Sequence, residues 1–198
     1  MLSISEAEAR AAALVERAAR AGADAADALY HADASTSVQV RLGELEDVSR
    51  AEGESIGLRF FVGSRSATVS SSDLSDEALS ALVERAAAMA REAPEDPWAG
   101  LAPEELLIRG PGPDVDADDG ADPSPLELKS RSLAIDEAGR AVAGVTNSDG
   151  SGVSAGRTVI ALATSHGFCR GYSTSGYSAS AGMIAGEGGE MQRDYAYH

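Results

Sequence analysis

The sequence predicts an α+β protein in which a helix-flanked antiparallel sheet is followed by a linker helix and a second, Gly/Ser-rich antiparallel β unit. Three observations predict this class. Segments with helical spacing of apolar residues begin at capping residues, and runs of alternating polarity lie between them. The runs follow one another too closely for crossover helices, which favours antiparallel connections. The carboxyl-terminal third is rich in Gly, Ser and Thr and alternates in the same way.

The first helix is predicted near the amino terminus. Ser5, with Glu8 three residues later, has the spacing of a capping box, and Gly22 supplies a stop. Between these signals, apolar side chains recur at helical spacing at Leu14, Val15, Ala18 and Ala19.

Two alternating runs follow, at residues 38–42 and 56–62. The pairs Gly43-Glu44, Gly53-Glu54 and Gly63-Ser64 are expected to separate these strands as turns.

A second helix is predicted to start at Ser75 and to end before Pro94 and Pro97. Its expected apolar face consists of Leu79, Leu82, Val83, Ala86 and Ala90.

An acidic stretch rich in Pro, Gly and Asp divides the chain. We expect residues 110–123 to be a linker between an amino-terminal α+β domain, residues 1–109, and an incomplete second domain, residues 124–198. Two helix-start signals coincide here: a proline in the first turn, Pro125, and the capping-box spacing of Ser124 and Glu127. The helix that they begin carries Leu126, Leu133, Ala134 and Ala138 as its apolar positions.

The last third is predicted to be an antiparallel ladder. Alternating runs lie at 158–164, 168–174, 177–184 and from residue 190, and the expected breaks are Asp149-Gly150, His166-Gly167 and Gly188-Gly189. Because such small side chains cover little core, the ladder should need a second layer. We therefore expect that layer beyond His198 or in another subunit, which would make the chain the front part of a larger, truncated architecture.

Composition excludes some classes of function. The formal net charge of -16, from 32 acidic and 16 basic residues, repels nucleic-acid phosphates, so direct DNA or RNA binding is not expected. The single cysteine, Cys169, cannot form an internal disulfide, which fits a reducing compartment. No secretory signal or membrane-length apolar run occurs, so the prediction is a cytoplasmic protein with no membrane partner.

The glycine-rich stretch at 150–158 resembles a phosphate loop only superficially. Its spacing is one residue short, Arg157 stands where a lysine is needed, and a strand is predicted to follow instead of a helix. A hairpin with glycines at its turns is the favoured interpretation of Gly150, Gly152, Gly156, Arg157 and Thr158.

No catalytic or metal site is predicted in this chain. His166 and Cys169 are three residues apart, but zinc needs three or four ligands, and a turn histidine beside a half-buried thiol is favoured. The sequence has no HExxxH motif for zinc and no GxSxG motif for a serine nucleophile.

Four tyrosines lie in or near the predicted ladder. They could line a groove for an extended peptide that pairs with a sheet edge, or they could pack across strands. The candidate peptide-binding residues are Tyr172, Tyr177, Tyr195 and Tyr197.

Several runs together resemble the PmbA (TldE) branch of the TldD/PmbA family, often labelled modulators of DNA gyrase. They are GELEDVSRAEGESIGLRFFVGSRSATVSSSDLS at 43–75, VTNSDGSG at 145–152, SHGFCRGYSTSGYS at 165–178 and GEMQRDYAYH at 189–198. The resemblance spans nearly the whole chain, in order, but only about the first half of the family's usual length.

The resemblance implies a cytosolic two-subunit peptidase that degrades or matures unfolded peptides. In such a complex a TldD-like partner subunit binds zinc through HExxxH, and the PmbA-type subunit lacks the motif. No zinc ligand or other cofactor is thereby assigned to this chain. Self-dimerisation, a zinc peptidase subunit with HExxxH downstream of His198, and a non-enzymatic gyrase modulator with an acidic DNA-mimic surface remain the alternatives.

Overall fold

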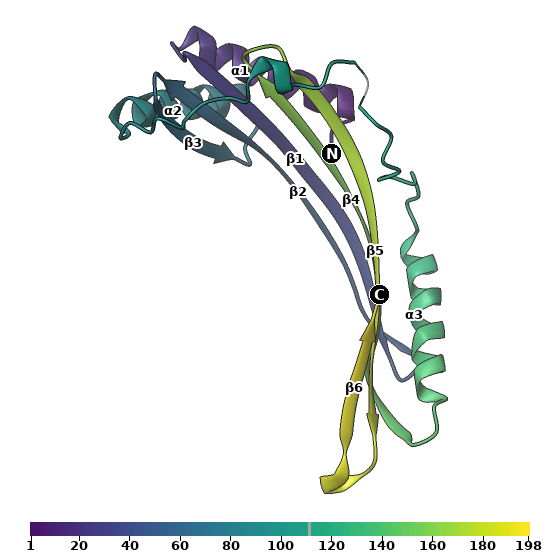
Figure 1. The fold of residues 1–198 in the computed structure, drawn as a ribbon. Helices are drawn as coiled ribbons and strands as arrows, with labels where there is room; N and C mark the ends of the chain where they lie inside the picture. The colour runs from purple at the N-terminus through teal and green to yellow at the C-terminus, as the bar shows by residue number, and fades with distance from the viewer. Residues whose placement is uncertain (111) are drawn as a thin grey trace. The chain divides into compact units, whose positions relative to one another are not determined.

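The computed structural model describes residues 1–110 and 112–198, and it contains three α-helices and six strands in that part of the chain (Figure 1). Their order confirms the predicted α+β class. The helices are α1 (Ile4–Arg20), α2 (Asp76–Glu92) and α3 (Pro125–Arg140). The strands are β1 (Ala25–Arg41), β2 (Glu44–Val62), β3 (Arg65–Ser71), β4 (Val145–Thr164), β5 (Cys169–Ala185) and β6 (Gln192–Tyr197).

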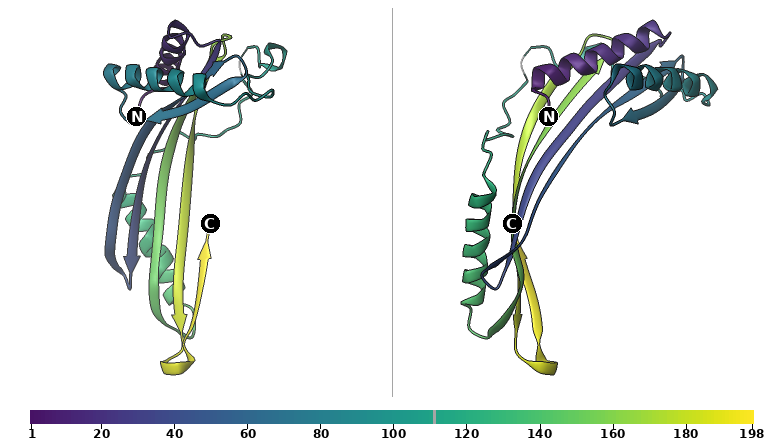
Figure 2. Two further views of the ribbon diagram at one scale, coloured as in Figure 1. Left: turned by 90° about the vertical axis from the view of Figure 1, so that its left-hand side faces the viewer. Right: turned by 180° about the vertical axis from the view of Figure 1, so that it is seen from behind.

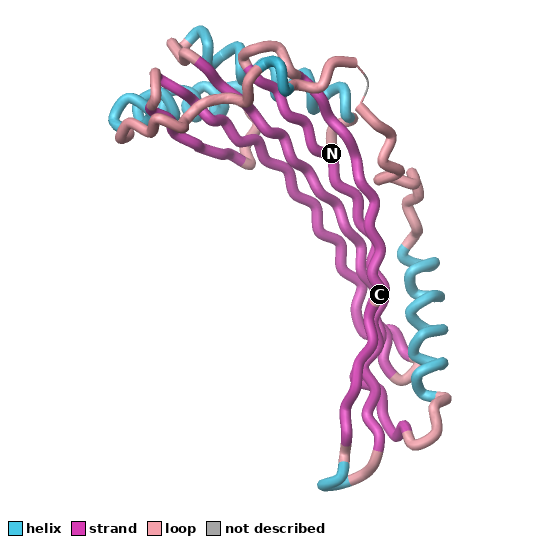
Figure 3. The backbone as a smooth tube through the Cα atoms, in the orientation of Figure 1, coloured by secondary structure: helices cyan, strands magenta, loops and turns pink. Residues whose placement is uncertain are grey.

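The six strands form one antiparallel sheet in the order β3-β2-β1-β4-β5-β6, with β3 and β6 at its edges. Figure 3 shows how short the turns between β1 and β2 and between β4 and β5 are. No helix in the described part of the chain has both the length and the apolar character needed to cross a bilayer.

The chain divides into two compact units, each assembled from separate stretches of sequence. Unit 1 combines residues 1–33, 53–117 and 158–173, and unit 2 combines residues 34–52, 118–157 and 174–198. The long strands contribute to both units. The boundaries at residues 109 and 124 stay a prediction.

Unit 1 holds the larger core. The helices α1 and α2 bury one face each against the strands, and the predicted apolar face of α2 is buried as expected. Ser75 caps α2 by accepting a hydrogen bond from the Ala78 N–H, as predicted. The largest fully buried side chains of this core are Tyr30, Phe60, Leu14, Ile56, Leu58, Leu79 and Leu82.

The start of α1 differs from the prediction. The capping box consists of Ser3 and Glu6, not Ser5 and Glu8, and the Glu6 carboxylate accepts hydrogen bonds from the N–H and the hydroxyl of Ser3 at 2.8 and 2.6 Å. Glu8 instead reaches β5, where its carboxylate accepts the Gly171 N–H at 2.7 Å. Both serine–glutamate pairs have the required spacing, so tertiary contacts decide between them.

Unit 2 has a small core in which α3 packs on β1 and β4, and Figure 1 shows α3 lying along these strands. The capping box of Ser124 and Glu127 is confirmed. The predicted apolar face of the helix is right only for Leu133, which packs against this core. Leu126 is exposed, and the buried stripe is Leu128, Ser132 and Asp136.

Two of the predicted breaks lie inside strands. Gly53-Glu54 belongs to the continuous strand β2, and Asp149-Gly150 belongs to β4. Likewise, the runs at 168–174 and 177–184 join into the single strand β5. The turns at Gly63-Ser64, His166-Gly167 and Gly188-Gly189 are confirmed.

The Asp149-Gly150 position is a bulge in β4. Before it, the even-numbered Ser148 faces Asp136 of α3, and after it the odd-numbered Val153 packs in the same core. A shift of alternation by one residue is the mark of a β-bulge, and Gly150 takes the φ of +115° that this irregularity requires.

The β1–β2 turn contains an unusual backbone conformation. Leu42 and Gly43 both have positive φ, at 52° and 82°, as a type I′ hairpin turn demands. A leucine is sterically strained at positive φ, whereas an asparagine tolerates this conformation better.

Replacing Leu42 by asparagine is therefore expected to raise the free energy of unfolding by about 1 kcal/mol. Leu42 is 51% exposed, so little burial is lost. Urea denaturation checks the result, and Leu45→Asn is the matched control, because Leu45 is similarly exposed but lies in regular strand β2. Equal effects of the two substitutions would contradict the backbone explanation.

Candidate peptide-binding surface in unit 2

The outer edge of β6 pairs with no further strand in the part of the chain that the structure describes. The N–H groups of Ala179 and His198 donate to each other's carbonyl groups, at 2.9 and 2.8 Å. Because antiparallel partners alternate, Asp194 and Ala196 also pair with β5 in this register. Arg193, Tyr195 and Tyr197 therefore direct their N–H and C=O groups away from β5, as the position of β6 at the sheet edge in Figure 2 illustrates.

One of these outward donors already has a local acceptor. The Tyr195 N–H donates to Oδ1 of the adjacent Asp194 at 2.8 Å. A carboxylate in this position competes with an incoming strand for the same donor, which is one way in which edge strands avoid indiscriminate pairing.

Two tyrosines stand side by side on β6. The rings of Tyr195 and Tyr197 stack with centroids 6.2 Å apart and planes inclined by 17°. The two residues are 69% and 78% exposed. Their cross-strand partners are Gly182 and Ser180, so the ring pair projects over a part of β5 with very small side chains.

This side of the sheet in unit 2, opposite α3, is called the open face below. It contains a shallow polar groove of about 240 Å³ beside the tyrosine pair. The hydroxyl of Ser37, which lines the groove, lies 2.8 Å from the Ser49 hydroxyl. The residues lining the groove are Ser37, Val38, Gln39, Asp47, Gly150, Gly152, Val153, Ser154, Ser178 and Ser180.

An ion pair on the open face holds the start of β6 in place. Arg193 pairs with Asp149 of β4 across the intervening strand β5. Gly182 makes this possible, because a Cβ atom there would lie only 3.2 Å from the Asp149 Cβ.

Tyr177 points to the other side of the sheet. On β5, Tyr177 lies an even number of residues from Met183, so both side chains lie on the same face, and Met183 touches Gly139 of α3. Ser180 and Gly182 lie on the opposite face. The Tyr177 hydroxyl donates to both carboxylate oxygens of Asp119, at 2.8 and 2.9 Å. This hydrogen bond raises the pKa of Tyr177 above its ordinary value.

The structure thus brings together two of the four predicted tyrosines. Tyr195 and Tyr197 form the exposed pair, whereas Tyr177 faces away from it. Tyr172 is 52% exposed and belongs to unit 1, whereas the other three tyrosines belong to unit 2.

A buried carboxylate supports the strands of unit 2. Asp136 of α3 is fully buried and accepts hydrogen bonds from the Gly43 N–H at 2.9 Å, the Ser148 hydroxyl at 2.6 Å and the Arg140 Nε at 2.8 Å. Burial raises the pKa of Asp136, but the hydrogen bonds from Ser148, Gly43 and Arg140 lower it by more, so the net shift is downward. The carboxylate joins α3 to the β1–β2 turn and to β4.

The other predicted candidates have structural roles. His166 Nδ1 lies 2.8 Å from the Thr164 hydroxyl and its Nε2 lies 3.0 Å from the Ala102 carbonyl oxygen, in the β4–β5 turn. Cys169 is half-buried beside α1, and burial raises the pKa of its thiol. The residues at 150–158 lie within strand β4, without the helix that a phosphate loop requires.

The donor groups do not fit a zinc site. Among residues 1–110 and 112–198, no group of three or more His, Cys, Asp or Glu side chains is arranged to hold a metal ion. No step of zinc chemistry can therefore be assigned to the described side chains.

Comparison with known families defines the class of protein. A family model described as PmbA/TldA metallopeptidase domain 1 matches residues 26–90, and one described as the PmbA/TldA metallopeptidase central domain matches residues 118–198. These are the domains of a metallopeptidase family. The chain belongs to the PmbA/TldD family, in its PmbA (TldE) branch.

Two curated relatives agree with this membership. The chain is 34% identical over 175 residues to metalloprotease PmbA of Escherichia coli O157:H7, which covers 88% of this chain and 39% of the relative. It is 31% identical over 184 residues to a metalloprotease PmbA homolog of Haemophilus influenzae, covering 92% and 40%. The chain thus spans about two fifths of the length of these relatives.

Solved structures share the fold. A proposed modulator of DNA gyrase from Bacteroides thetaiotaomicron superposes with a TM-score of 0.87 at 22% identity, covering 100% of this chain and 45% of that one. TldE from Thermococcus kodakarensis superposes with a TM-score of 0.77 at 16% identity, covering 93% and 41%.

Proposed function

We propose that this chain is the amino-terminal part of a PmbA/TldE-type subunit in a cytoplasmic TldD/TldE-type metallopeptidase complex that degrades or matures unfolded peptides. Its part in that activity is to hold extended peptide. Zinc, with the water that it activates for hydrolysis, would be supplied by a TldD-like partner subunit.

The exposed ring pair of Tyr195 and Tyr197, beside the polar groove of the open face, is the observation that carries the peptide-binding role. A peptide that adds to a sheet edge gains main-chain hydrogen bonds whatever its sequence, which suits substrates that are unfolded. Among the described residues, Arg193 and Tyr197 direct their backbone groups away from β5, whereas the Tyr195 N–H already donates to Asp194. A side chain of the peptide on the open face would lie against the exposed ring pair.

The non-catalytic assignment rests on the resemblance to the PmbA (TldE) branch, which implies that HExxxH lies in the TldD-like subunit. The rival assignment, a zinc peptidase subunit with HExxxH further along, is tested directly. Zinc content and peptide cleavage are measured for the full-length protein alone and with a TldD-like partner. We expect cleavage only with the partner, and stoichiometric zinc with activity in the isolated protein would refute the assignment.

Removing either ring of the stacked pair should weaken peptide capture. Tyr195→Ala and Tyr197→Ala are each expected to reduce binding of a labelled unfolded peptide by about fivefold, because an aromatic contact contributes roughly 1 kcal/mol. Both residues are exposed, so the fold should persist. Fluorescence anisotropy with the full-length complex measures the change.

Tyr177→Ala is the matched control for this prediction, because Tyr177 is also an exposed tyrosine but its side chain projects from the opposite face of the sheet. It should leave peptide binding unchanged. Equal losses from Tyr177→Ala and Tyr195→Ala would contradict the assignment of the peptide to the open face.

A further inference from the structure

Unit 1 contains a small pocket where the segment that follows α2 passes the turn between β4 and β5. Its volume is about 180 Å³, below the roughly 300–1,000 Å³ of pockets that hold drug-sized ligands. The pocket therefore has room for a small chemical group and not for a length of folded chain. It shares no residue with the groove of the open face.

Two contacts hold the walls of this pocket together. The His166 Nε2–H donates to the Ala102 carbonyl oxygen at 3.0 Å, since a carbonyl oxygen can only accept. The Arg170 guanidinium donates to the Gly110 carbonyl oxygen at 3.4 Å. Because Gly110 directly follows Arg109 in the chain, Arg170 lies beside the segment that carries the second arginine of the pocket.

The lining of the pocket has an excess of positive charge. Arg109 and Arg170 line it, and Glu104 is the one carboxylate among the described residues of the lining. Neither arginine forms an ion pair with another described residue. Arg170 uses two of its five N–H donors on the carbonyl oxygens of Cys169 and Gly110, so most of its donors remain for a ligand. The pocket therefore favours an anion, in a chain whose net charge is -16.

Apolar side chains lie beside these charges and can be reached by an occupant. Leu107, Ile108 and Phe168 line the same pocket, and none of them is buried. Ile108 is 46% exposed. A bare inorganic anion would leave these side chains without a contact. A ligand that carries a carboxylate next to an apolar group would use both parts of the lining.

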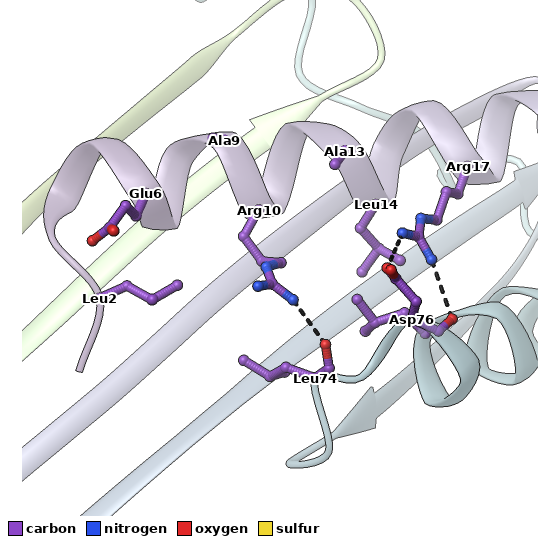
Figure 4. A pocket seen from close by; sticks show the side chains of 10 residues that line it. Leu2, Glu6, Ala9, Arg10, Ala13, Leu14, Arg17, Leu74 and Asp76 are labelled. Atoms are coloured by element: carbon purple, nitrogen blue, oxygen red, sulfur yellow. Dashed lines mark hydrogen bonds and ion pairs between the residues drawn. The ribbon is translucent and has the colours of Figure 1, made fainter.

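The larger groove beside α1 lacks this combination (Figure 4). Its two arginines are matched by the carboxylates of Glu6 and Asp76. Arg17 pairs with Asp76, and Arg10 donates to the Leu74 carbonyl oxygen at 2.7 Å. The excess of cationic groups is thus a property of the smaller pocket and not of every hollow in unit 1.

We propose that the smaller pocket binds the carboxyl end of a peptide whose last residue is apolar. The two arginines bind the α-carboxylate, and the three apolar side chains contact the terminal side chain. A free carboxyl terminus carries both groups on one Cα atom, which an acidic side chain within a peptide does not. This inference goes beyond the role proposed for unit 2, because main-chain pairing with β6 does not involve the end of the peptide.

The test compares two peptides that are labelled at the amino end, end in leucine and differ only in the terminal group, a free carboxylate or an amide. Any pairing with β6 is common to both probes, so their difference reports the terminal group alone. Anisotropy with the full-length protein should show about fivefold tighter binding of the free carboxylate. A carboxylate probe that ends in glycine should bind about fivefold more weakly than the leucine probe, because it lacks the apolar contact.

Arginine variants locate the probe. Arg109→Gln and Arg170→Gln should each reduce the preference for the free carboxylate, and the double variant should bind the carboxylate and amide probes equally. Arg85→Gln is the matched control and should keep the preference, because Arg85 is an exposed arginine of unit 1 that does not line the pocket.

Three results would overturn the proposal. They are equal binding of the carboxylate and amide probes, equal binding of the leucine and glycine probes, and a preference for the carboxylate that survives in the double variant. Failure of the role proposed for unit 2 would appear separately, as unchanged binding of both probes in Tyr195→Ala.

Discussion

Replacing Asp136 by asparagine is expected to lower the free energy of unfolding by about 3 kcal/mol, because three donors converge on its two buried carboxylate oxygens. An asparagine offers one oxygen, and its amide group would face at least one of these donors. Urea denaturation at neutral pH measures the loss. Glu137→Gln is the matched control, since its side chain is exposed, and it should change stability by less than about 0.5 kcal/mol.

The same carboxylate gives this effect a defined pH dependence. Folding lowers the pKa of Asp136 below its unfolded value, which is near 4, so its stabilisation is fully present above that value. It is lost as the pH falls through the folded pKa. The difference in unfolding free energy between the wild type and Asp136→Asn should therefore be constant near neutrality and shrink below about pH 4. A difference that grows on acidification would contradict this explanation.

Asp136 also shows why the face of α3 could not be predicted from apolar spacing. The pattern of Leu126, Leu133, Ala134 and Ala138 assumes that leucine and alanine mark the buried side. The buried stripe contains a serine and an aspartate, because the turn at Gly43 and the hydroxyl of Ser148 supply partners from distant parts of the sequence. One signal was present in the sequence, since Asp136 and Arg140 have the i, i+4 spacing of a helical ion pair.

Glycine-containing turn signals in the sequence predicted turns correctly only where the chain leaves the sheet. Gly63 and Gly167 have positive φ in turns between strands, as glycine in a turn commonly does. Gly150 also has positive φ, but neighbouring strands hold it inside β4 as a bulge. Periodicity within a short window cannot distinguish these outcomes, because pairing on both sides of β4 determines whether the strand continues.

The candidate surface was likewise predictable only in part. The sequence placed Tyr195 and Tyr197 at alternate positions of a strand, which puts them on one face. The separation of Tyr177 from them depends on the register of β5 against β6, and that register is not encoded in any short motif. The pairing of Arg193 with Asp149 was missed for the same reason, since the two residues lie on strands that are not sheet neighbours.

Gly171 on β5 lies under the first turns of α1, and its substitution is expected to have the second large effect. A Cβ atom at this position would lie 2.9 Å from the Ile160 carbonyl oxygen, 3.0 Å from Ile4 Cγ2 and 3.2 Å from Ala161 Cβ. The carbonyl belongs to strand β4, so relief requires movement of the backbone as well as of a side chain. The Gly171 N–H also donates to Glu8, which ties the helix to the strand at the same point.

Gly171→Ala is therefore expected to lower the free energy of unfolding by about 2 kcal/mol, the usual cost of overpacking. Gly176→Ala is a control in the same strand, because nothing lies within 4 Å of the added methyl group. It should be neutral or stabilise by up to about 1 kcal/mol, since alanine restricts the unfolded chain. Urea denaturation of both variants checks the prediction. A Gly171→Ala protein as stable as Gly176→Ala would mean that α1 can move away from β5 without loss, and that close packing at Gly171 does not hold the helix in place.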